Sequence, residues 1–386
     1  MPEEKINLLF LIMQMAMGGS EQLVYRLVKN IDHNLFAPSV GWFFQEKPLK
    51  EFEELRIPLY FIPKRKRFDW DTMNRIGRIV RENSIDVINA HHFMSFFYAY
   101  YGAKVANSAK LVYTEHSEND VLRVTGKWKP IGRYLLKRSD AAVGVSEAVS
   151  KTIGAHFRIR SEKIHTIENG VDLSLFSQDK EEKIRLRSRF GFPPTDILVG
   201  IVANFRKNKN HIFLLKAFHE VAKERSDVKM VIVGQGFPGD PESSEQAIMD
   251  FIRENGLKDG VRLLGYRTDV HELLRMIDIF CLVSYKEGMS ISLIEAMACG
   301  LPVVGTNVEG IRGVIDPDEN GFIVEPDDVP GLTHALNRMI GDSGLRHRMG
   351  ESSRQYATER YSLRRCVKET EQLFLSCISA SAFGVG

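Results

Sequence analysis

Short apolar runs alternate with amphipathic helical patterns along almost the whole chain. The first pair is the run INLLFLIM at 6–13 and the helical segment at 20–31. Further apolar runs lie at 86–90, 110–114, 141–145, 197–203, 228–234, 261–265, 277–283, 302–305 and 321–325. This alternation is typical of parallel sheets that are covered by helices on both faces. Because one sheet with so many strands would be unusually wide, the sequence predicts an α/β protein with two doubly wound, Rossmann-like domains.

The boundary between the two domains is expected near residues 170–195. The turn-rich stretch 168–176 leads into a charged segment, which ends at two prolines just before a new apolar run. We therefore predict an N-terminal domain at 1–172 and a second domain at 173–362. The last helical pattern, at 363–379, follows the second domain.

Composition excludes several classes of protein. Of the 386 residues, 44% are hydrophobic and 26% are charged, which is typical of a globular protein, and no apolar run is long enough to span a bilayer. The net charge of +2 is too small to indicate nucleic-acid binding. The four cysteines show no CxxC spacing and predict reduced thiols in a cytoplasmic protein: Cys281, Cys299, Cys366 and Cys377.

The stretch YKEGMSISLIEAMACGLPVV contains two glutamates in unusual places. Glu287 follows a buried strand, beside Gly288, and Glu295 lies in an otherwise apolar helix that Ser290 is expected to cap. The amide groups of 289–292 form an anion site at the helix N-terminus, and a carboxylate such as Glu295 suits the vicinal hydroxyls of a ribose. A buried glutamate paired with a cation explains Glu295 equally well.

Two other segments lie where a strand gives way to a helix. IVANFRKNKNH at 201–211 places Arg206 and Lys209 there, which suits a diphosphate, although a solvated basic loop is the simpler interpretation. Gly18 and Gly19 separate the first strand from the first helix and allow close approach of a ligand, or form a plain turn.

Three histidines follow strands at the same predicted edge as the paired glycines. His91 and His92 follow the strand at 86–90, and His116 lies in the polar loop TEHSE after the next strand. The chain has no HExxH motif and no Cys or His residues at zinc-ligand spacing. We therefore predict that no metal ion is bound, and a hydrogen-bonded histidine is the ordinary alternative to a catalytic one.

Two further patterns admit alternative functions. GQGFPG at 234–239 matches a dinucleotide-binding motif and raises the alternative of an NAD-dependent oxidoreductase, but Pro238 and the residues after it delay the helix that such a site requires. Basic residues interleave with aromatic ones at 64–70 and 126–138, which suits either peripheral contact with an anionic membrane or solvated surface.

Taken together, the motifs resemble those of one family. EGMSISLIEAMACGLPVVGT at 287–306 resembles the E-x7-E segment of family 4 glycosyltransferases of the GT-B fold. Other motifs follow the family's order along the chain: MGGSEQ, NAHH, TEHS, VSEAV, NGVD, VANFRKNK, VGQG, LLGYRTDV and NGFIV. The resemblance implies two domains facing a cleft, with the last helix crossing back to the first domain.

The resemblance also implies roles for residues of the second domain. Glu295 would hold the ribose of a nucleotide-sugar, and Glu287 would contact the hydroxyl groups of the donor sugar. Lys209, with Arg206, would neutralise the leaving diphosphate. Many members carry this arginine five residues before the lysine, where this chain has Asn204. Further donor contacts would come from Gly288, Met289, Ser290, Tyr266 and Arg267, the last two near the nucleobase.

In the first domain, Gly18 and Gly19 would line the cleft, and His116 would touch the sugar near the reacting carbon. The implied enzyme is a retaining, metal-independent glycosyltransferase that needs no cofactor beyond its nucleoside-diphosphate sugar donor. Its acceptor would be a sugar or a lipid-linked molecule in cell-surface polysaccharide or glycolipid synthesis, at or near the inner face of the membrane. A nucleotide-sugar epimerase or hydrolase of the same architecture is the alternative, and a non-catalytic nucleotide-sugar sensor is a third.

Overall fold

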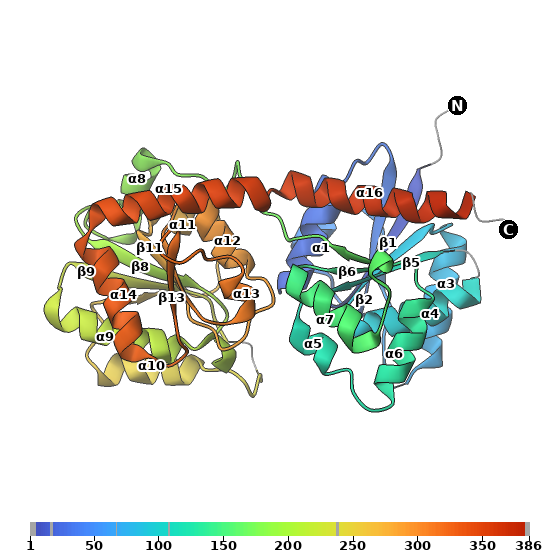
Figure 1. Ribbon diagram of the computed structural model, residues 1–386, viewed down its shortest axis with the longest axis horizontal. Coiled ribbons are helices and arrows are strands. Elements are labelled where there is room, and N and C mark those ends of the chain that lie inside the picture. Colours follow the sequence, from blue (N-terminus) through green and yellow to red (C-terminus); the bar gives the residue numbers. More distant parts are fainter. Residues whose placement is uncertain (1–4, 16–17, 67, 107–108, 237–238, 383–386) are drawn as a thin grey trace. The chain divides into compact units, whose positions relative to one another are not determined.

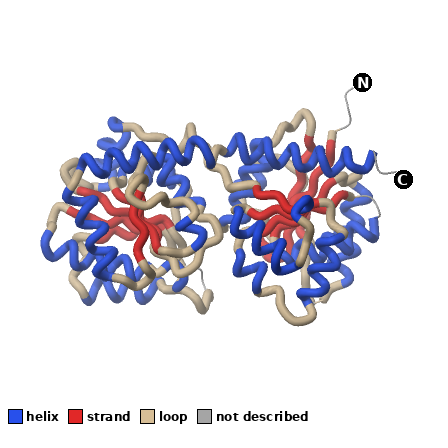
Figure 2. Tube along the Cα trace, in the orientation of Figure 1, coloured by secondary structure: helices blue, strands red, loops and turns tan. Residues whose placement is uncertain are grey.

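The computed structural model describes residues 5–15, 18–66, 68–106, 109–236 and 239–382, which form two compact units (Figure 1). Unit 1 consists of Met1–Gly170 and Leu363–Gly386, and unit 2 of Val171–Ser362. Each unit contains one sheet that lies between helices (Figure 2). The predicted α/β class with two doubly wound sheets is confirmed. The predicted boundary at 172/173 lies two residues from the change of unit after Gly170.

The sheet of unit 1 has the order β3-β2-β1-β4-β5-β6-β7, and its neighbouring strands pair in parallel. Its strands are β1 (Ile6–Gln14), β2 (Phe36–Phe44), β3 (Leu59–Phe61), β4 (Val87–His91), β5 (Lys110–Glu115), β6 (Ala141–Gly144) and β7 (Ile164–Thr166). Its helices are α1 (Gly19–Asn30), α2 (Lys50–Glu54), α3 (Trp70–Glu82), α4 (Phe93–Ala106), α5 (Glu118–Leu122), α6 (Trp128–Lys137), α7 (Glu147–Phe157), the 3-10 turn η1 (Ser161–Lys163) and α16 (Leu363–Ala382).

The sheet of unit 2 has the order β10-β9-β8-β11-β12-β13, again parallel. Its strands are β8 (Ile197–Val202), β9 (Val228–Val233), β10 (Val261–Leu263), β11 (Ile279–Leu282), β12 (Val303–Thr306) and β13 (Gly321–Val324). Its helices are α8 (Lys180–Phe190), the 3-10 turn η2 (Lys207–Lys209), α9 (His211–Glu224), α10 (Glu245–Glu254), α11 (Val270–Met276), α12 (Ile291–Ala298), α13 (Glu309–Arg312), α14 (Val329–Gly341) and α15 (Ser343–Arg360).

Strands β2, β3 and β7 were not among the predicted strands. In β2, Pro38 interrupts the apolar run, and proline lacks the amide donor that a central strand uses. Pro38 nevertheless pairs in register with Leu8 of β1, and the strand is buried almost throughout. Burial of its aromatic residues in the sheet outweighs the one missing donor.

The final helix packs on unit 1. Glu371 of α16 accepts a hydrogen bond from the amide of Asp32 (2.7 Å), and the ring of Phe374 meets Phe10 and Phe36 edge-on. These contacts bury the apolar face of α16 against the sheet. The return of the last helix to the first domain, which the sequence analysis expected, is therefore present.

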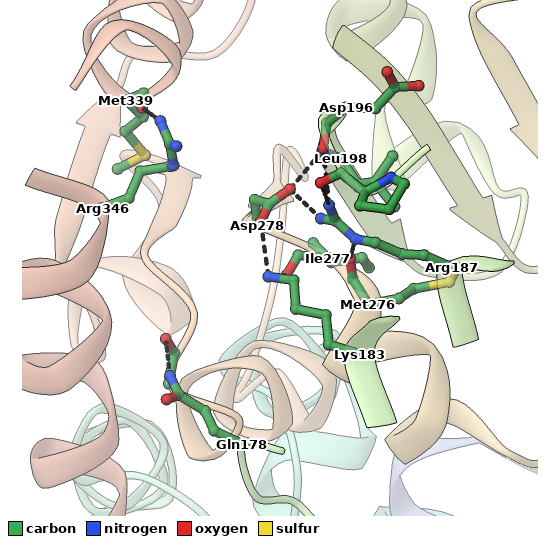
Figure 3. Close-up of polar contacts among 12 residues, drawn as sticks. Gln178, Lys183, Arg187, Asp196, Leu198, Met276, Ile277, Asp278, Met339 and Arg346 are labelled. Atoms are coloured by element: carbon green, nitrogen blue, oxygen red, sulfur yellow. Dashed lines mark hydrogen bonds and ion pairs between the residues drawn. The ribbon is translucent and has the colours of Figure 1, made fainter. Parts of the chain in front are cut away.

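In unit 2, Asp278 fixes the amino end of β11 (Figure 3). Its carboxylate accepts hydrogen bonds from Lys183 Nζ (2.7 Å), from the amide of Leu198 (2.7 Å) and from Arg187. Burial alone would raise the pKa of Asp278, but the two cations lower it below its ordinary value. The ionic network ties α8 to β8 and β11, so the loops at the far ends of these strands start from a rigid base.

Candidate active site

Both sheets reverse their strand order at one point. In unit 2 the reversal falls between β8 and β11, and in unit 1 it falls between β1 and β4. Ligands of doubly wound sheets bind outside the carboxyl ends of the strands at such a switch point. The segments 204–211 and 284–290 follow β8 and β11, so the donor residues expected from the sequence come together at this edge.

Lys209 and Glu287 form a partly buried ion pair at the switch point of unit 2. Lys209 Nζ lies 2.6 Å from Glu287 Oε1, and the two side chains are 19% and 9% exposed. Ser284 Oγ donates to the same oxygen at 2.6 Å. The amide of Tyr285 donates to the carbonyl of Asn208 (2.8 Å), which joins the two loops through their backbones. A lysine and a glutamate 78 residues apart thus meet at the switch point of this sheet.

Further contacts hold both loops in place. Asn210 adopts a left-handed conformation (φ 54°), which turns the chain from η2 into α9. Its side chain donates to Asp327 (3.0 Å), and the same carboxylate accepts from the Tyr285 hydroxyl (2.8 Å). Gly310 of α13 packs so closely that a Cβ there would lie 2.2 Å from the carbonyl oxygen of Gly288. The loop that carries Glu287 is therefore clamped between its neighbours.

Helix α12 starts where the sequence predicted. Ser290 is its N-cap, and its hydroxyl accepts a hydrogen bond from the amide of Leu293 (3.4 Å). Gly288 and Met289 connect β11 to this cap, so their amide groups lie at the helix N-terminus. Glu295 lies on the second turn and is 6% exposed.

The other cations expected at the donor site lie in ion pairs of their own. Arg206 Nε contacts Asp240 Oδ2 at 2.6 Å, and its side chain is about half exposed. Arg267 Nε donates to Asp269 at 2.8 Å, and Tyr266 next to it is half exposed. Arg206 would therefore have to exchange Asp240 for a phosphate in order to act on a donor.

In unit 1, histidines and a buried glutamate form a network at the ends of β4 and β5. The Glu115 side chain is fully buried, and its carboxylate accepts hydrogen bonds from the Tyr113 hydroxyl (2.7 Å), from His92 Nδ1 (2.8 Å) and from the His116 amide (2.9 Å). His116 Nε2 is hydrogen-bonded to His91 Nδ1 (2.8 Å). The candidate histidine thus has its ring fixed from one side by a buried neighbour.

The charges of this network follow from its contacts. Burial alone would lower the pKa of His92, but Glu115 raises it to about 9, with smaller contributions from Asp120 and Glu21. Burial and the nearby His92 cation hold the pKa of His116 well below its ordinary value of 6.5. The rings of His92 and His116 are 4.9 Å apart. Near neutral pH, a neutral His116 therefore lies beside a protonated His92.

The paired glycines begin α1. Gly18 is its N-cap in extended conformation, and Glu21 in the first turn is buried, with its carboxylate accepting a hydrogen bond from Ser20 (2.9 Å). A Cβ on Gly18 would lie 2.6 Å from Glu21 Oε2. Gly18 thus leaves room for a buried carboxylate whose pKa is raised by burial. Residues 16–17 lie outside the described structure, as do residues 237–238 of the G-x-G-x-x-G segment.

Sequence reasoning missed Tyr113 and Asp120. The available signal was the polar loop TEHSEND directly after a buried strand.

His92, Glu115 and Asp120 bring potential metal-ligand atoms within 4.8 Å of one another. Glu115 already accepts three hydrogen bonds, and a protonated His92 offers no lone pair at Nδ1. The absence of a metal ion nevertheless stays a prediction.

Two family models together match most of the chain. Residues 17–175 match the model described as Glycosyltransferase Family 4, and residues 182–356 match the model described as Glycosyl transferases group 1. The two matched regions correspond to unit 1 and unit 2. The region matched in unit 1 contains the histidine network, and the region matched in unit 2 contains the Lys209–Glu287 ion pair.

Curated relatives match over most of their own length. The chain is 27% identical over 327 residues to the N-acetyl-alpha-D-glucosaminyl L-malate synthase of Bacillus anthracis, covering 84% of this chain and 83% of the relative. It is 22% identical over 368 residues to the UDP-Gal:alpha-D-GlcNAc-diphosphoundecaprenol alpha-1,3-galactosyltransferase of Escherichia coli, covering 91% and 90%.

Solved structures agree in fold. HepE of Anabaena, crystallised in complex with UDP and glucose, superposes with a TM-score of 0.84 at 21% identity, covering 96% of this chain and all of that one. A sucrose-phosphate synthase from Thermosynechococcus elongatus superposes with a TM-score of 0.78 at 18% identity, covering 97% and 100%. These likenesses confirm the predicted GT-B fold.

Proposed function

Because the chain belongs to the family 4, group 1 glycosyltransferases, we propose that it moves a sugar from a nucleoside-diphosphate sugar to an acceptor hydroxyl group. The observation that carries this proposal is the Lys209–Glu287 ion pair at the switch point of unit 2. A cation that suits a phosphate and a carboxylate that suits hydroxyl groups lie side by side there, and a sugar diphosphate presents both kinds of group.

The chemistry follows from where charge develops. The bond between the anomeric carbon and the diphosphate oxygen breaks, and its electron pair leaves with the diphosphate. The acceptor oxygen bonds to the same carbon and releases its proton. Lys209, with Arg206, stabilises the charge that accumulates on the departing diphosphate, and the amide groups at the start of α12 assist. Glu287 accepts hydrogen bonds from the donor sugar.

The remaining donor contacts continue along unit 2. Glu295 binds the ribose hydroxyl groups, and the backbone of Gly288, Met289 and Ser290 binds the sugar and phosphate. Tyr266 and Arg267 lie near the nucleobase. The half exposure of Tyr266 and the clamped loop before α12 support these roles.

Unit 1 carries the acceptor side of the proposal. A neutral His116 hydrogen-bonds the donor sugar near the reacting carbon. Gly18 and Gly19 line the site near the phosphates of the donor. Retention of anomeric configuration and independence of metal ions are part of the proposal through the family resemblance. Independence of metal ions is supported by the three hydrogen bonds that Glu115 already accepts, because they occupy the oxygens that would bind an ion.

Two acceptor classes are suggested by the names of relatives, a hydroxy acid and a lipid-linked saccharide. We favour synthesis of a cell-surface polysaccharide or glycolipid in the cytoplasm, with peripheral contact at the inner face of the membrane through 64–70 and 126–138. Among the described residues, no helix is long and apolar enough to cross a membrane.

Thermal unfolding with UDP, GDP, ADP and NAD tests the donor site. A ligand that binds only the folded protein raises its melting temperature. We expect one nucleoside diphosphate to stabilise the protein, and Lys209→Ala or Glu295→Ala to abolish the shift. Lys216→Ala, an exposed lysine on α9, is the matched control and should keep it.

Stabilisation by NAD alone would refute the proposal in favour of the oxidoreductase. Release or isomerisation of the donor sugar at full rate without any acceptor would favour the epimerase or hydrolase. Glu287→Ala should reduce turnover far more than folding stability, and equal loss of both would argue against its contact with the sugar.

A further inference from the structure

Unit 1 contains a pocket beside the histidine network that the proposed donor chemistry does not use. We propose that this pocket binds a neutral pyranose as the acceptor, with the C–H face of the sugar against Trp128 and its hydroxyl groups at Asp120 and His92. The inference rests on the proposed transferase activity and names the class of its acceptor.

The pocket has the size and position of a small-molecule site. Its volume is about 350 Å³, and it opens at the carboxyl ends of β4 and β5, where doubly wound sheets bind ligands. Nine side chains line it, five of them apolar: Met13, His92, Phe93, Met94, Glu115, Asp120, Arg123, Val124 and Trp128.

One wall is aromatic and rigidly held. Trp128 meets Phe97 edge-on with ring centroids 5.3 Å apart, and meets Phe93 edge-on at 6.4 Å. Within the part of the chain that the structure describes, the indole N–H of Trp128 has no hydrogen-bond partner. An oriented indole with an available donor suits an amphipathic ligand that has an apolar face and polar edges, as a pyranose has.

The polar side chains of the lining have hydrogen-bonding capacity left for a ligand. Glu115 is fully engaged by its three donors, so it acts by holding His92 in place. Asp120 contacts Arg123 at 3.3 Å through Oδ1 alone, and the side chain of Arg123 is 79% exposed. One oxygen of Asp120 and Nε2 of His92 therefore have capacity for hydroxyl groups of a ligand.

The backbone at His92 supports a binding role. His92 has φ 69°, the left-handed region that residues other than glycine rarely adopt. Its amide is nevertheless bonded to the carbonyl of Thr114 (2.9 Å), and its ring to Glu115, so tertiary contacts hold it there. Unfavourable backbone conformations of this kind cluster at ligand sites, where they hold a side chain in the position that binding requires.

The charges of the pocket select between the acceptor classes. Its two carboxylates, Glu115 and Asp120, each already face one cation, His92 and Arg123. A dianionic hydroxy acid would bring two more negative charges close to these carboxylates. The described residues of the lining hold no unpaired cation that could balance these charges, so binding of the acid would be opposed by repulsion. A neutral sugar instead donates hydroxyl hydrogens to Asp120 and accepts from His92. The lining thus favours a saccharide over an acid such as L-malate.

Saturation-transfer NMR on the full chain tests this assignment. The probes are the methyl glycosides of glucose, galactose and N-acetylglucosamine, with L-malate for contrast. We expect saturation of the ring protons of one face of at least one glycoside, and little for malate. Trp128→Ala should weaken binding about tenfold or more, and Asp120→Asn, at a half-exposed position, should also weaken it without disturbing the core. Trp70→Ala, an exposed tryptophan of α3 outside this lining, is the matched control and should bind normally.

Three results would overturn the inference. They are preferential binding of malate, absence of glycoside binding, and glycoside binding that survives both Trp128→Ala and Asp120→Asn. The shift in melting temperature with nucleoside diphosphates, measured on the same preparation, distinguishes failure of this inference from failure of the proposed transferase activity. Glycoside binding in a protein that no nucleoside diphosphate stabilises would leave a sugar site but overturn its role as an acceptor site.

Discussion

The protonation of His92 can be tested through the stability of unit 1. The pKa of this histidine is about 9 in the folded protein, against an ordinary value of 6.5. A group whose pKa is raised on folding stabilises the protein fully below its unfolded pKa, and the stabilisation is lost as the pH rises through the folded pKa. The difference corresponds to about 3 kcal/mol at most, and about 2 kcal/mol of it should disappear between pH 6.5 and roughly pH 8.5.

His92→Asn is the informative change, because asparagine tolerates the positive φ at this position. Urea unfolding at several pH values, followed by tryptophan fluorescence, reports on unit 1 alone, since Trp42, Trp70 and Trp128 all belong to it. The native protein should lose stability across this pH window, while the variant should be less stable at low pH and nearly independent of pH.

Two controls isolate the effect. Asp120→Asn should keep most of the pH dependence, because Glu115 is the main group that raises the pKa of His92. The buried thiols of Cys366 and Cys377, whose pKa values are raised by burial to about 12 and about 11, ionise on unfolding at higher pH in both proteins. Parallel stability curves for the native protein and His92→Asn would refute the reasoning, because they would show that His92 carries no extra proton in the folded state.

Three other predictions concern packing and pairing. Gly310→Ala should remove nucleotide-induced stabilisation in thermal unfolding, because the added Cβ would displace the carbonyl of Gly288. An unchanged shift in melting temperature would show that close packing of Gly310 against this loop is not needed for nucleotide binding. Arg158→Gly should stabilise the protein by about 1 kcal/mol in urea unfolding, because Arg158 ends α7 with φ 53°, and a loss of stability would count against this. In a double-mutant cycle followed by circular dichroism, Lys209→Met and Glu287→Gln should show a coupling of about 2 kcal/mol, since either change alone leaves a partly buried partner without its counter-charge. Strict additivity of the two changes would rule the coupling out.

Much of the fold could be read from local pattern. Apolar runs of strand length between helical segments predicted ten strands that the structure contains at nearly the same bounds, and Ser290 was predicted as the cap of α12. Strand β2 was missed because Pro38 breaks the local pattern, and its burial depends on the neighbouring strand β1.

The sequence by itself determined which chemical groups the chain carries at the ends of its strands. Glu287, Lys209 and His116 each follow an apolar run, and the direction of a parallel strand brings such residues to one edge of a sheet. Spacing within one segment, such as the eight positions from Glu287 to Glu295, is a local property, and it carried the resemblance to the family.

Only the tertiary structure decided which of these groups meet and what charge they hold. The strand order places β8 beside β11, and this pairing brings Lys209 to Glu287 across 78 positions of sequence. The proton on His92 likewise depends on the buried carboxylate of Glu115 from the next strand. Hydrogen bonds and charge interactions act over a few ångströms in space, so they depend on which strands become neighbours rather than on distance along the chain.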